Sequence, residues 1–259
     1  MNIIKNVLAL MMICILSPLA LFADEVEIDG LKYELNVENS TATVTGYTKN
    51  LSRKDINIPE SVKYNENIFT VVAIGDHAFY ECSGFTGDLT IQNSVTEIGN
   101  YAFFDCSGLT GSLTIPNSVT TIGERAFAYC RGFTGDLKIP SGITTIKYET
   151  FYKCSGFNGS LTIPNSVKEI GDHAFDGCSG FTGELTIPNS VTEIGLFAFC
   201  DCDGLTGTLT LGSSLTNIGE GAFFCGGFND VVSLNIMKAM LKNSAIIQKS
   251  FTALPQEWV

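Results

Sequence analysis

Cysteines at a fixed spacing are the first candidates for chemistry in this sequence. Six of them recur every 24 residues and so form one column: Cys82, Cys106, Cys130, Cys154, Cys178 and Cys202. In an exported chain an even number of cysteines suggests disulfides, and neighbouring repeats could bring Cα atoms to the ~5.5 Å that a bridge needs. Each cysteine also stands beside phenylalanine columns, where a small buried apolar residue fits. We predict free buried thiols in this column, with disulfides as the alternative.

Beyond that column the sequence offers little for catalysis or metal binding. Cys200 falls at a position that does not repeat, which predicts an exposed, reactive thiol. The two histidines, His77 and His173, hold the same repeat position four copies apart. Strands stacked ~4.8 Å apart would separate them by about 19 Å, so they cannot share a metal, and neither belongs to a Ser or Cys triad. The run at 201–204 lacks the third ligand of a calcium loop, and Gly212 replaces its closing glutamate. We expect surface histidines, no catalytic residue, no metal, no cofactor and no enzymatic activity.

A repeated unit must position all of these residues. The stretch IGNYAFFDCSGLTGSLTIPNSVTT, at 98–121, is one copy of a 24-residue unit that recurs without insertion or deletion from Ile74 to Asn217. Six full copies begin at Ile74, Ile98, Ile122, Ile146, Ile170 and Ile194, and a partial seventh begins at Ile218. A fixed period of this length is typical of a solenoid.

Apolar residues occupy the same columns in each copy. The main column is phenylalanine: Phe79, Phe103, Phe127, Phe151, Phe175, Phe199 and Phe223. A second follows six residues later: Phe85, Leu109, Phe133, Phe157, Phe181 and Leu205. Leu-x-Ile pairs such as Leu89 with Ile91 then alternate as in a short strand, and prolines such as Pro116 end it. We predict a β-rich solenoid of short parallel strands joined by turns or short helical segments, in which stability comes from neighbouring coils.

These residues also carry a family resemblance. The run IPNSVTEIG-x-x-AF-x-x-C, present almost verbatim at 115–130, 163–178 and 187–202, resembles the leucine-rich repeats of BspA-like (treponemal-type) bacterial surface proteins. The similarity covers roughly Val26 to Phe223. It implies a leucine-rich repeat fold and attachment to host matrix proteins or to other cells.

The ends of the chain differ from the repeats. Residues 1–23 have the layout of a secretory signal peptide, with an uncleaved anchor as the alternative. Residues 24–73 read as a β-hairpin cap and irregular first repeat, with strands at Val26–Ile28, 31–35 and Thr41–Tyr47 and a further hairpin around Asn65-Glu66-Asn67. The solenoid is predicted at 74–225, where Cys225 stands one residue before the expected column position. Residues 226–259 form a tail that is either a helical cap, with Leu234, Met237, Leu241 and Ala245 at helical spacing, or a remnant of recombination or a frameshift.

Charge limits the possible partners. Without 1–23, which holds Lys5, the chain has 14 Lys and Arg against 27 Asp and Glu, and 14 minus 27 gives a net charge of -13. Such a surface repels phosphate backbones and acidic membrane faces, which argues against nucleic acid. No later segment is long and apolar enough to span a bilayer.

Outward positions fall into two sets. Beside the Leu-x-Ile pairs the outward positions are uniform and polar. One row there holds Thr90, Thr114, Lys138, Thr162, Thr186 and Thr210. This row would either bind an extended partner weakly or simply be solvated. Around the Ala-Phe pair the copies differ most and are often aromatic, which is typical of protein contacts. The candidate ligand-binding residues there are Tyr80, Tyr101, Phe104, Tyr129, Tyr148, Tyr152, Leu196 and Phe197. The alternative is that these rings lean over the phenylalanine column and are half buried.

The leading hypothesis is therefore a secreted or cell-surface protein that mediates protein–protein interaction as an adhesin-like solenoid. Its partners would be host extracellular matrix proteins or other cell surfaces, as the resemblance implies. The alternative is a structural or envelope-organising solenoid that self-associates without a host ligand.

Overall fold

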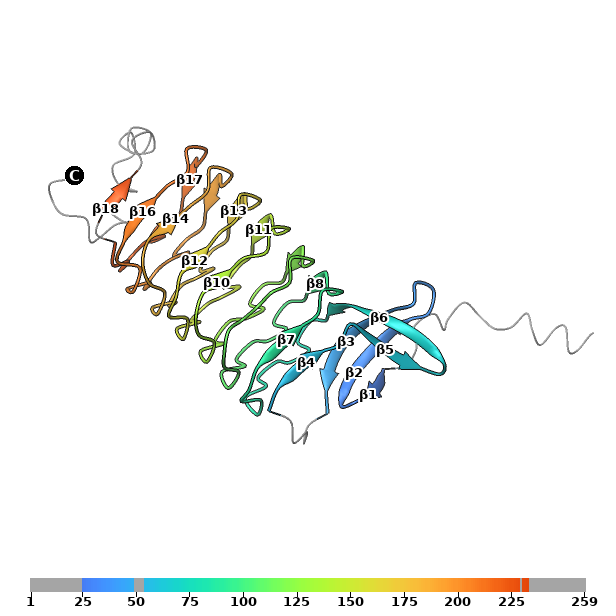
Figure 1. Ribbon diagram of the computed structural model, residues 1–259. Helices are drawn as coiled ribbons and strands as arrows, with labels where there is room; N and C mark the ends of the chain where they lie inside the picture. Colours follow the sequence, from blue (N-terminus) through green and yellow to red (C-terminus); the bar gives the residue numbers. More distant parts are fainter. Residues whose placement is uncertain (1–24, 49–53, 229, 233–259) are drawn as a thin grey trace, which may run out of the picture.

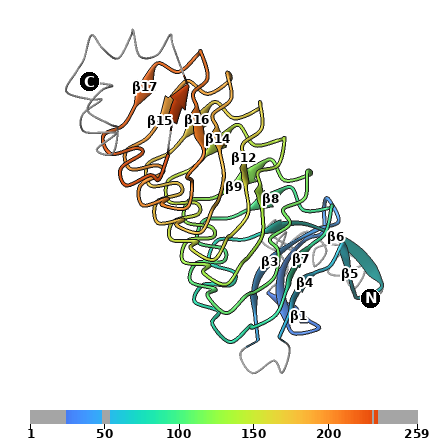
Figure 2. The same ribbon diagram turned by 60° about the vertical axis from the view of Figure 1, so that its left-hand side comes forward.

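The computed structural model describes residues 25–48, 54–228 and 230–232, the last three by their backbone alone. The chain winds into coils that stack along one axis, with a β-sheet cap at one end and strand β18 at the other (Figures 1 and 2). The predicted signal peptide and most of the C-terminal tail lie outside the described residues.

The coils contribute short strands to two parallel rows on different sides of the solenoid, except that the coil that holds Ser112 joins the first row only through the bridge of Ser112 with Thr134. The first strand row holds β4 (Ile56–Ile58), β7 (Leu89–Ile91), β10 (Leu137–Lys138), β12 (Leu161–Thr162), β14 (Leu185–Thr186), β16 (Thr208–Thr210) and β18 (Asp230–Val232). The second strand row holds β6 (Asn67–Ile74), β8 (Glu97–Ile98), β9 (Thr121–Ile122), β11 (Thr145–Ile146), β13 (Glu169–Ile170), β15 (Glu193–Ile194) and β17 (Asn217–Ile218). Pairings such as Leu137 with Leu161 and Ile170 with Ile194 keep the 24-residue register.

The cap is a sheet that continues into the second strand row. Strand β1 (Val26–Ile28) pairs antiparallel with β2 (Leu31–Asn36), and β2 with β3 (Thr41–Tyr47). Strand β5 (Ser61–Tyr64) pairs antiparallel with β6, whose other edge pairs with β3 and whose last residues pair with β8. The β1–β2 turn at Asp29-Gly30 and the β5–β6 turn at Asn65-Glu66 have positive φ at both residues, as two-residue hairpins require.

Stacked phenylalanines fill the interior. The rings of Phe79, Phe103, Phe127, Phe151, Phe175, Phe199 and Phe223 lie face to face with centroids 5.1–5.5 Å apart and planes within 11°. All are buried. The second apolar column is buried beside them, and Phe157 stacks on Phe181 at 5.2 Å. The fold predicted from the columns is confirmed.

The third side of each coil, which we call the turn side, carries the Ala-Phe pair in turns; the described residues contain no helix. Two residues in each turn have positive φ, one two positions before the phenylalanine and one two positions after it, as with Tyr101 and Asp105 around Phe103. Three backbone N–H groups per turn donate to the next coil, among them Phe103 N–H to Ala126 O at 2.8 Å. Between these two left-handed residues the Ala-Phe pair is buried, as Ala102 and Phe103 are.

Close approach of the coils explains the glycine after the first isoleucine in every copy but the one at Ile146, where Lys147 follows. A Cβ at Gly123 would clash with the backbone of Asn100 in the preceding coil. Glycine therefore allows the coils to stack at hydrogen-bonding distance.

The cysteine column only partly follows the prediction. Cys130, Cys154, Cys178 and Cys202 are free and buried, and each thiol donates to the carbonyl of a phenylalanine 27 residues earlier at 3.0–3.2 Å. Cys82 and Cys106, however, form a disulfide, so the free-thiol prediction was wrong for this pair. These two stand in the first coils after the cap, one repeat apart.

The predictions for Cys200 and Cys225 were also wrong. Cys200 is buried, with 8% of its surface exposed. Cys225 is the exposed thiol. The repeat loses no residue before it: Gly226 takes the column position, donating to Phe223 O as Cys178 donates to Phe175 O. Two residues are lost later, because Val231 pairs with Leu209 across 22 positions.

We predict that Phe151→Ala lowers the free energy of unfolding by ~3–5 kcal/mol, because it removes one ring from the middle of the stack and leaves a cavity. Thr162→Ala, at an exposed position of β12, should change it by less than ~0.5 kcal/mol. Urea denaturation followed by circular dichroism measures both. Equal effects of the two substitutions would contradict the role of the column.

We also predict a defined order of alkylation. In the folded protein Cys225 should react first, because it is the exposed free thiol among the described residues. After denaturation without reductant, peptide mapping should find label at Cys130, Cys154, Cys178, Cys200, Cys202 and Cys225, and none at Cys82 or Cys106. Label at Cys82 or Cys106 before reduction would disprove the disulfide.

Candidate functional site

The aromatic side chains predicted to bind a ligand lie in contact with one another along the turn side. We call this continuous set the aromatic ladder: His77, Tyr80, Tyr101, Phe104, Tyr129, Tyr148, Tyr152, His173 and Phe197. Its members come from the outward positions around the Ala-Phe pair, where the left-handed residues point side chains away from the core. The ladder runs along the stack and does not surround a cavity.

The first coils hold paired stacks. Tyr80 lies flat on Phe104 with ring centroids 5.0 Å apart, and His77 lies flat on Tyr101 at 4.9 Å. Tyr101 and Phe104 touch at 5.6 Å, so the two stacks support each other. Tyr80 keeps 40% of its surface exposed. The rings therefore reach solvent and also lean on neighbouring coils, while ligand binding by them stays a prediction.

Arg125 lies between two rings of the ladder, Tyr101 and Tyr148, and contacts both. Its guanidinium carbon lies 5.5 Å from the centre of the Tyr101 ring and 5.1 Å from that of Tyr148, and it donates to both hydroxyls at 2.9 and 3.2 Å. It also forms a two-point ion pair with Glu149, at 2.8 and 3.0 Å. That pairing raises the pKa of Arg125 above its ordinary value. Glu149 is almost completely buried, so Arg125 is the partner that compensates its charge.

Tyr129 lies on the ladder from a different position than the sequence suggested. It is two residues after Phe127, in a left-handed conformation, whereas the place after Phe127 belongs to the buried Ala128. The Tyr129 ring still meets Phe104 and Tyr152 edge to face, at 5.4 and 5.2 Å. The ammonium of Lys153 lies 5.0 Å from the centre of the Tyr152 ring.

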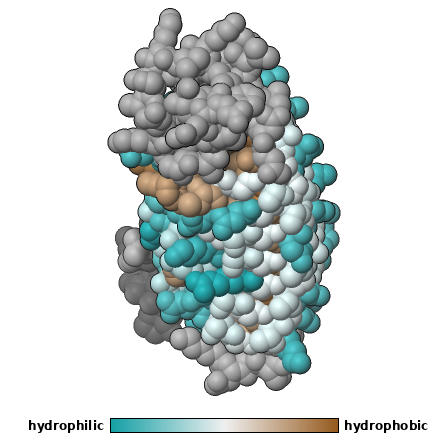
Figure 3. All heavy atoms as spheres, turned by 90° about the vertical axis from the view of Figure 1, so that its left-hand side faces the viewer, coloured by the Kyte–Doolittle hydropathy of each residue, from teal (hydrophilic) through white to brown (hydrophobic). Residues whose placement is uncertain are grey.

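The predicted apolar cluster at the far end is divided by depth. Leu196 is 44% exposed, and its N–H donates to Asp172 Oδ1 at 2.7 Å. Phe197 is half buried, because its ring stacks on His173 at 5.3 Å and occupies the space above Gly221. Figure 3 shows hydrophobic surface near the C-terminal end of the described coils and mostly pale or hydrophilic surface elsewhere on that face.

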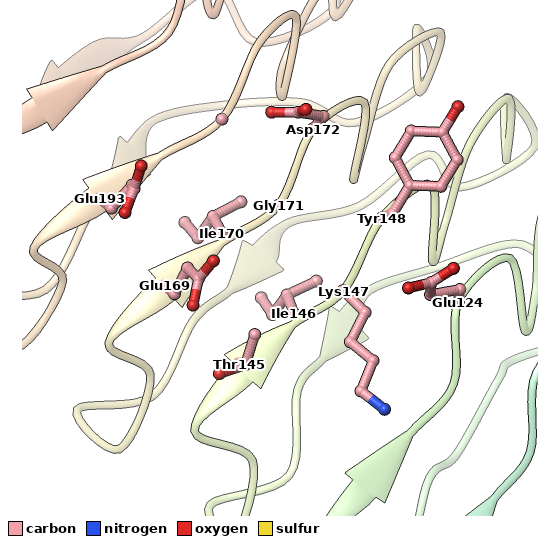
Figure 4. A pocket seen from close by; sticks show the side chains of 11 residues that line it. Glu124, Thr145, Ile146, Lys147, Tyr148, Glu169, Ile170, Gly171, Asp172 and Glu193 are labelled. Carbon is pink, nitrogen blue, oxygen red and sulfur yellow. The ribbon is translucent and has the colours of Figure 1, made fainter.

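An acidic groove lies beside the ladder, over strands β11, β13 and β15. It encloses about 400 Å³ and is lined by the carboxylates of Glu124, Glu169, Asp172 and Glu193, with Lys147 as the lysine of its lining. Tyr148 belongs both to this lining and to the ladder (Figure 4). Sequence reasoning missed the groove because its residues come from four different coils.

The first strand row offers the alternative surface. Thr90, Thr114, Lys138, Thr162 and Thr186 are exposed there and Thr210 is half exposed. This row is as uniform and polar as the sequence predicts, and it lies on another side of the coil than the ladder. It provides no aromatic anchor.

We predict that Arg125→Ala lowers the free energy of unfolding by ~1–3 kcal/mol, because the Glu149 carboxylate would stay buried without its partner. Arg131→Ala, which removes an exposed guanidinium 5.3 Å from the Tyr129 ring centre, should cost less than ~1 kcal/mol. The double variant Arg125→Ala with Glu149→Gln should recover part of the loss. Thermal unfolding measures all three, and additive losses in the double variant would contradict the coupling.

Comparisons with known proteins agree with this architecture. A family model described as the BspA type leucine rich repeat region matches residues 72–159 and 158–253 in six copies. No curated protein matches the chain. No helix among the described residues is long and apolar enough to cross a bilayer.

Several solved structures are similar. A leucine rich cell surface protein from Faecalibacterium prausnitzii is 23% identical, with 82% of this chain and 76% of that one covered and a TM-score of 0.48. A leucine-rich repeat protein from Bacteroides ovatus is 25% identical over 80% and 70%, with a TM-score of 0.35. The T. pallidum leucine rich repeat protein is 22% identical over 86% and 94%, with a TM-score of 0.44. With most of its length matched by the repeat model, this chain belongs to the BspA-type leucine-rich repeat family.

Proposed function

We propose that this protein is exported and acts, without catalysis, as an adhesin-like binding protein that takes an extended protein ligand along the aromatic ladder. The observation that carries the proposal is the ladder itself, a run of outward rings in mutual contact from His77 to Phe197. A surface that is long and open suits a partner that lies across several coils.

The chemistry of the ladder favours protein binding. Tyrosine and arginine supply a large share of the binding energy in protein interfaces. Tyr80, Tyr148 and Leu196 expose enough surface to be contacted, while stacking and hydrogen bonds hold the rings on the ladder in place. Because these side chains are already ordered, a ligand loses less conformational entropy when it binds them.

The acidic groove adds a preference for cationic ligands. It shares Tyr148 with the ladder and has four carboxylates against one lysine in its lining. Opposite charges in a partner would speed association and fix its register on the ladder. We therefore expect the ligand to carry lysine or arginine beside its apolar anchors.

Export and partner class rest on the sequence. The N-terminal 23 residues have the layout of a signal peptide. Resemblance to BspA-like surface proteins supports host matrix proteins or other cell surfaces as partners. The proposal places the ladder outside the cell, where such partners are accessible.

We predict that the purified chain from residue 24 onward binds immobilised fibronectin, fibrinogen or partner cells, and that Tyr80→Ser with Tyr148→Ser and Leu196→Ser weakens this binding about tenfold or more. All three residues are exposed, so the variant should keep its circular dichroism spectrum. Surface plasmon resonance gives the dissociation constants.

The matched control is Thr114→Ala with Thr162→Ala and Thr186→Ala on the first strand row, which should bind like the parent chain. Loss of binding in this control, with binding retained by the ladder variant, would move the site to the strand row. Absence of binding to every surface, together with concentration-dependent light scattering, would replace adhesion by self-association.

A further inference from the structure

Two successive coils lack a ring where the ladder would continue. The position after the core phenylalanine is aromatic in Tyr80, Phe104 and Tyr152, but the next two coils place Asp176 and Cys200 there. Asp201 follows Cys200 in the chain. One carboxylate oxygen of each aspartate and the Cys200 sulfur all lie within 4.8 Å of one another. The turn side therefore carries a compact group of potential metal ligands beside the C-terminal end of the ladder.

These groups are placed as metal ligands usually are. The Cys200 thiol is free and buried, with 8% exposure, and the Asp176 side chain is 13% exposed. His173 Nδ1 lies 2.7 Å from the second Asp176 oxygen, which fixes the orientation of that carboxylate. Such outer hydrogen bonds are typical of metal-binding carboxylates. A fourth group comes from the next coil: Cys225, an exposed free thiol, stands one repeat after Asp201.

The charges of the group favour a cation. Two carboxylates and a thiol meet here, with ligand atoms within 4.8 Å of one another. The ring of His173 contacts Asp176 at 2.7 Å, and the ammonium of Lys153 lies over the Tyr152 ring. A divalent cation among these ligands would compensate both carboxylates directly.

We propose that Asp176, Cys200 and Asp201 bind one zinc ion, with Cys225 as the fourth ligand. Sulfur and carboxylate oxygen together suit zinc, whereas calcium and magnesium take oxygen alone. Zinc–sulfur and zinc–oxygen bonds of about 2.3 and 2.1 Å would draw the ligand atoms closer together than their present separation of up to 4.8 Å. Binding deprotonates both thiols, so each zinc releases two protons as it forms two zinc–thiolate bonds.

The zinc site would cross-link three coils. Asp176 belongs to the copy that begins at Ile170, Cys200 and Asp201 to the next, and Cys225 to the seventh, which is incomplete. The repeat pattern ends there, with two residues missing before β18. Zinc would thus stabilise the end of the solenoid, a role independent of the proposed adhesion.

The test uses the whole mature chain, reduced, treated with chelator and then dialysed free of it. Titration with zinc chloride in a calorimeter should give one ion per chain and about two protons released, measured in buffers of different ionisation enthalpy. Cobalt chloride should produce a thiolate-to-metal charge-transfer band. Asp176→Asn, Cys200→Ser and Asp201→Asn should each weaken zinc binding by more than the roughly 10–100-fold typical of outer-shell losses.

Asp105→Asn is the matched control, because Asp105 holds the Asp201 position four coils earlier and should leave zinc binding unchanged. Asp201→Asn is isosteric and exposed, so it tests the site even if Cys200→Ser destabilises the fold. Absence of zinc binding by the parent chain, equal binding by Asp201→Asn, or a cobalt complex without a thiolate band would overturn the proposal. Retained binding by Cys225→Ser would overturn the fourth ligand.

Discussion

Everything in this structure depends on the contact between one coil and the next. The phenylalanine rings stack at 5.1–5.5 Å, which is close to the separation of the hydrogen-bonded backbones around them. A face-to-face stack at this spacing repeats only if every coil has the same length and the same turn, so the packing of the core imposes the 24-residue period. A coil in the middle of the stack has a neighbour on each side that constrains its length, in agreement with the absence of insertions from Ile74 to Asn217. The length changes at the ends, where Ile56 pairs with Leu89 across 33 positions and Leu209 with Val231 across 22.

The same constraint creates the aromatic ladder. The residues two positions before and after each phenylalanine have a left-handed backbone conformation. Residues other than glycine adopt it at a cost of ~1–2 kcal/mol, yet Tyr101, Tyr129 and Phe197 do so. Stacking against the next coil compensates for part of that cost, as when Phe197 packs on His173 at 5.3 Å. The repeat therefore places one outward side chain above another, and an aromatic residue at such a position gains a partner in the neighbouring coil. Binding surface and coil packing are consequently not separable on the turn side.

Sequence reasoning reached the columns but not the directions within a turn. The period fixes which residues share a column, so the buried phenylalanines, the strands beside Leu89 and the hairpin at Asn65-Glu66 followed from the pattern. It does not fix how deeply a side chain of a turn is buried, and for that reason Cys200 was expected in solvent. Nor can a periodic pattern distinguish a bonded pair from free thiols, because Cys82 and Cys106 read like every other member of their column.

Departures from the repeat are informative because the repeat is otherwise so uniform. Where packing alone decides, a position carries the same residue type in every copy; where a position faces outward, its residue is free to serve another purpose. Asp176 and Cys200 break the aromatic column in adjacent coils, and Asp201 and Cys225 follow on the neighbouring column. Asp176, Cys200 and Asp201 bring their ligand atoms within 4.8 Å of one another, with the Asp176 carboxylate hydrogen-bonded to His173. The proposed zinc site would account for these residue types and for their position at the end of the solenoid, where a coil has the fewest neighbours to stabilise it.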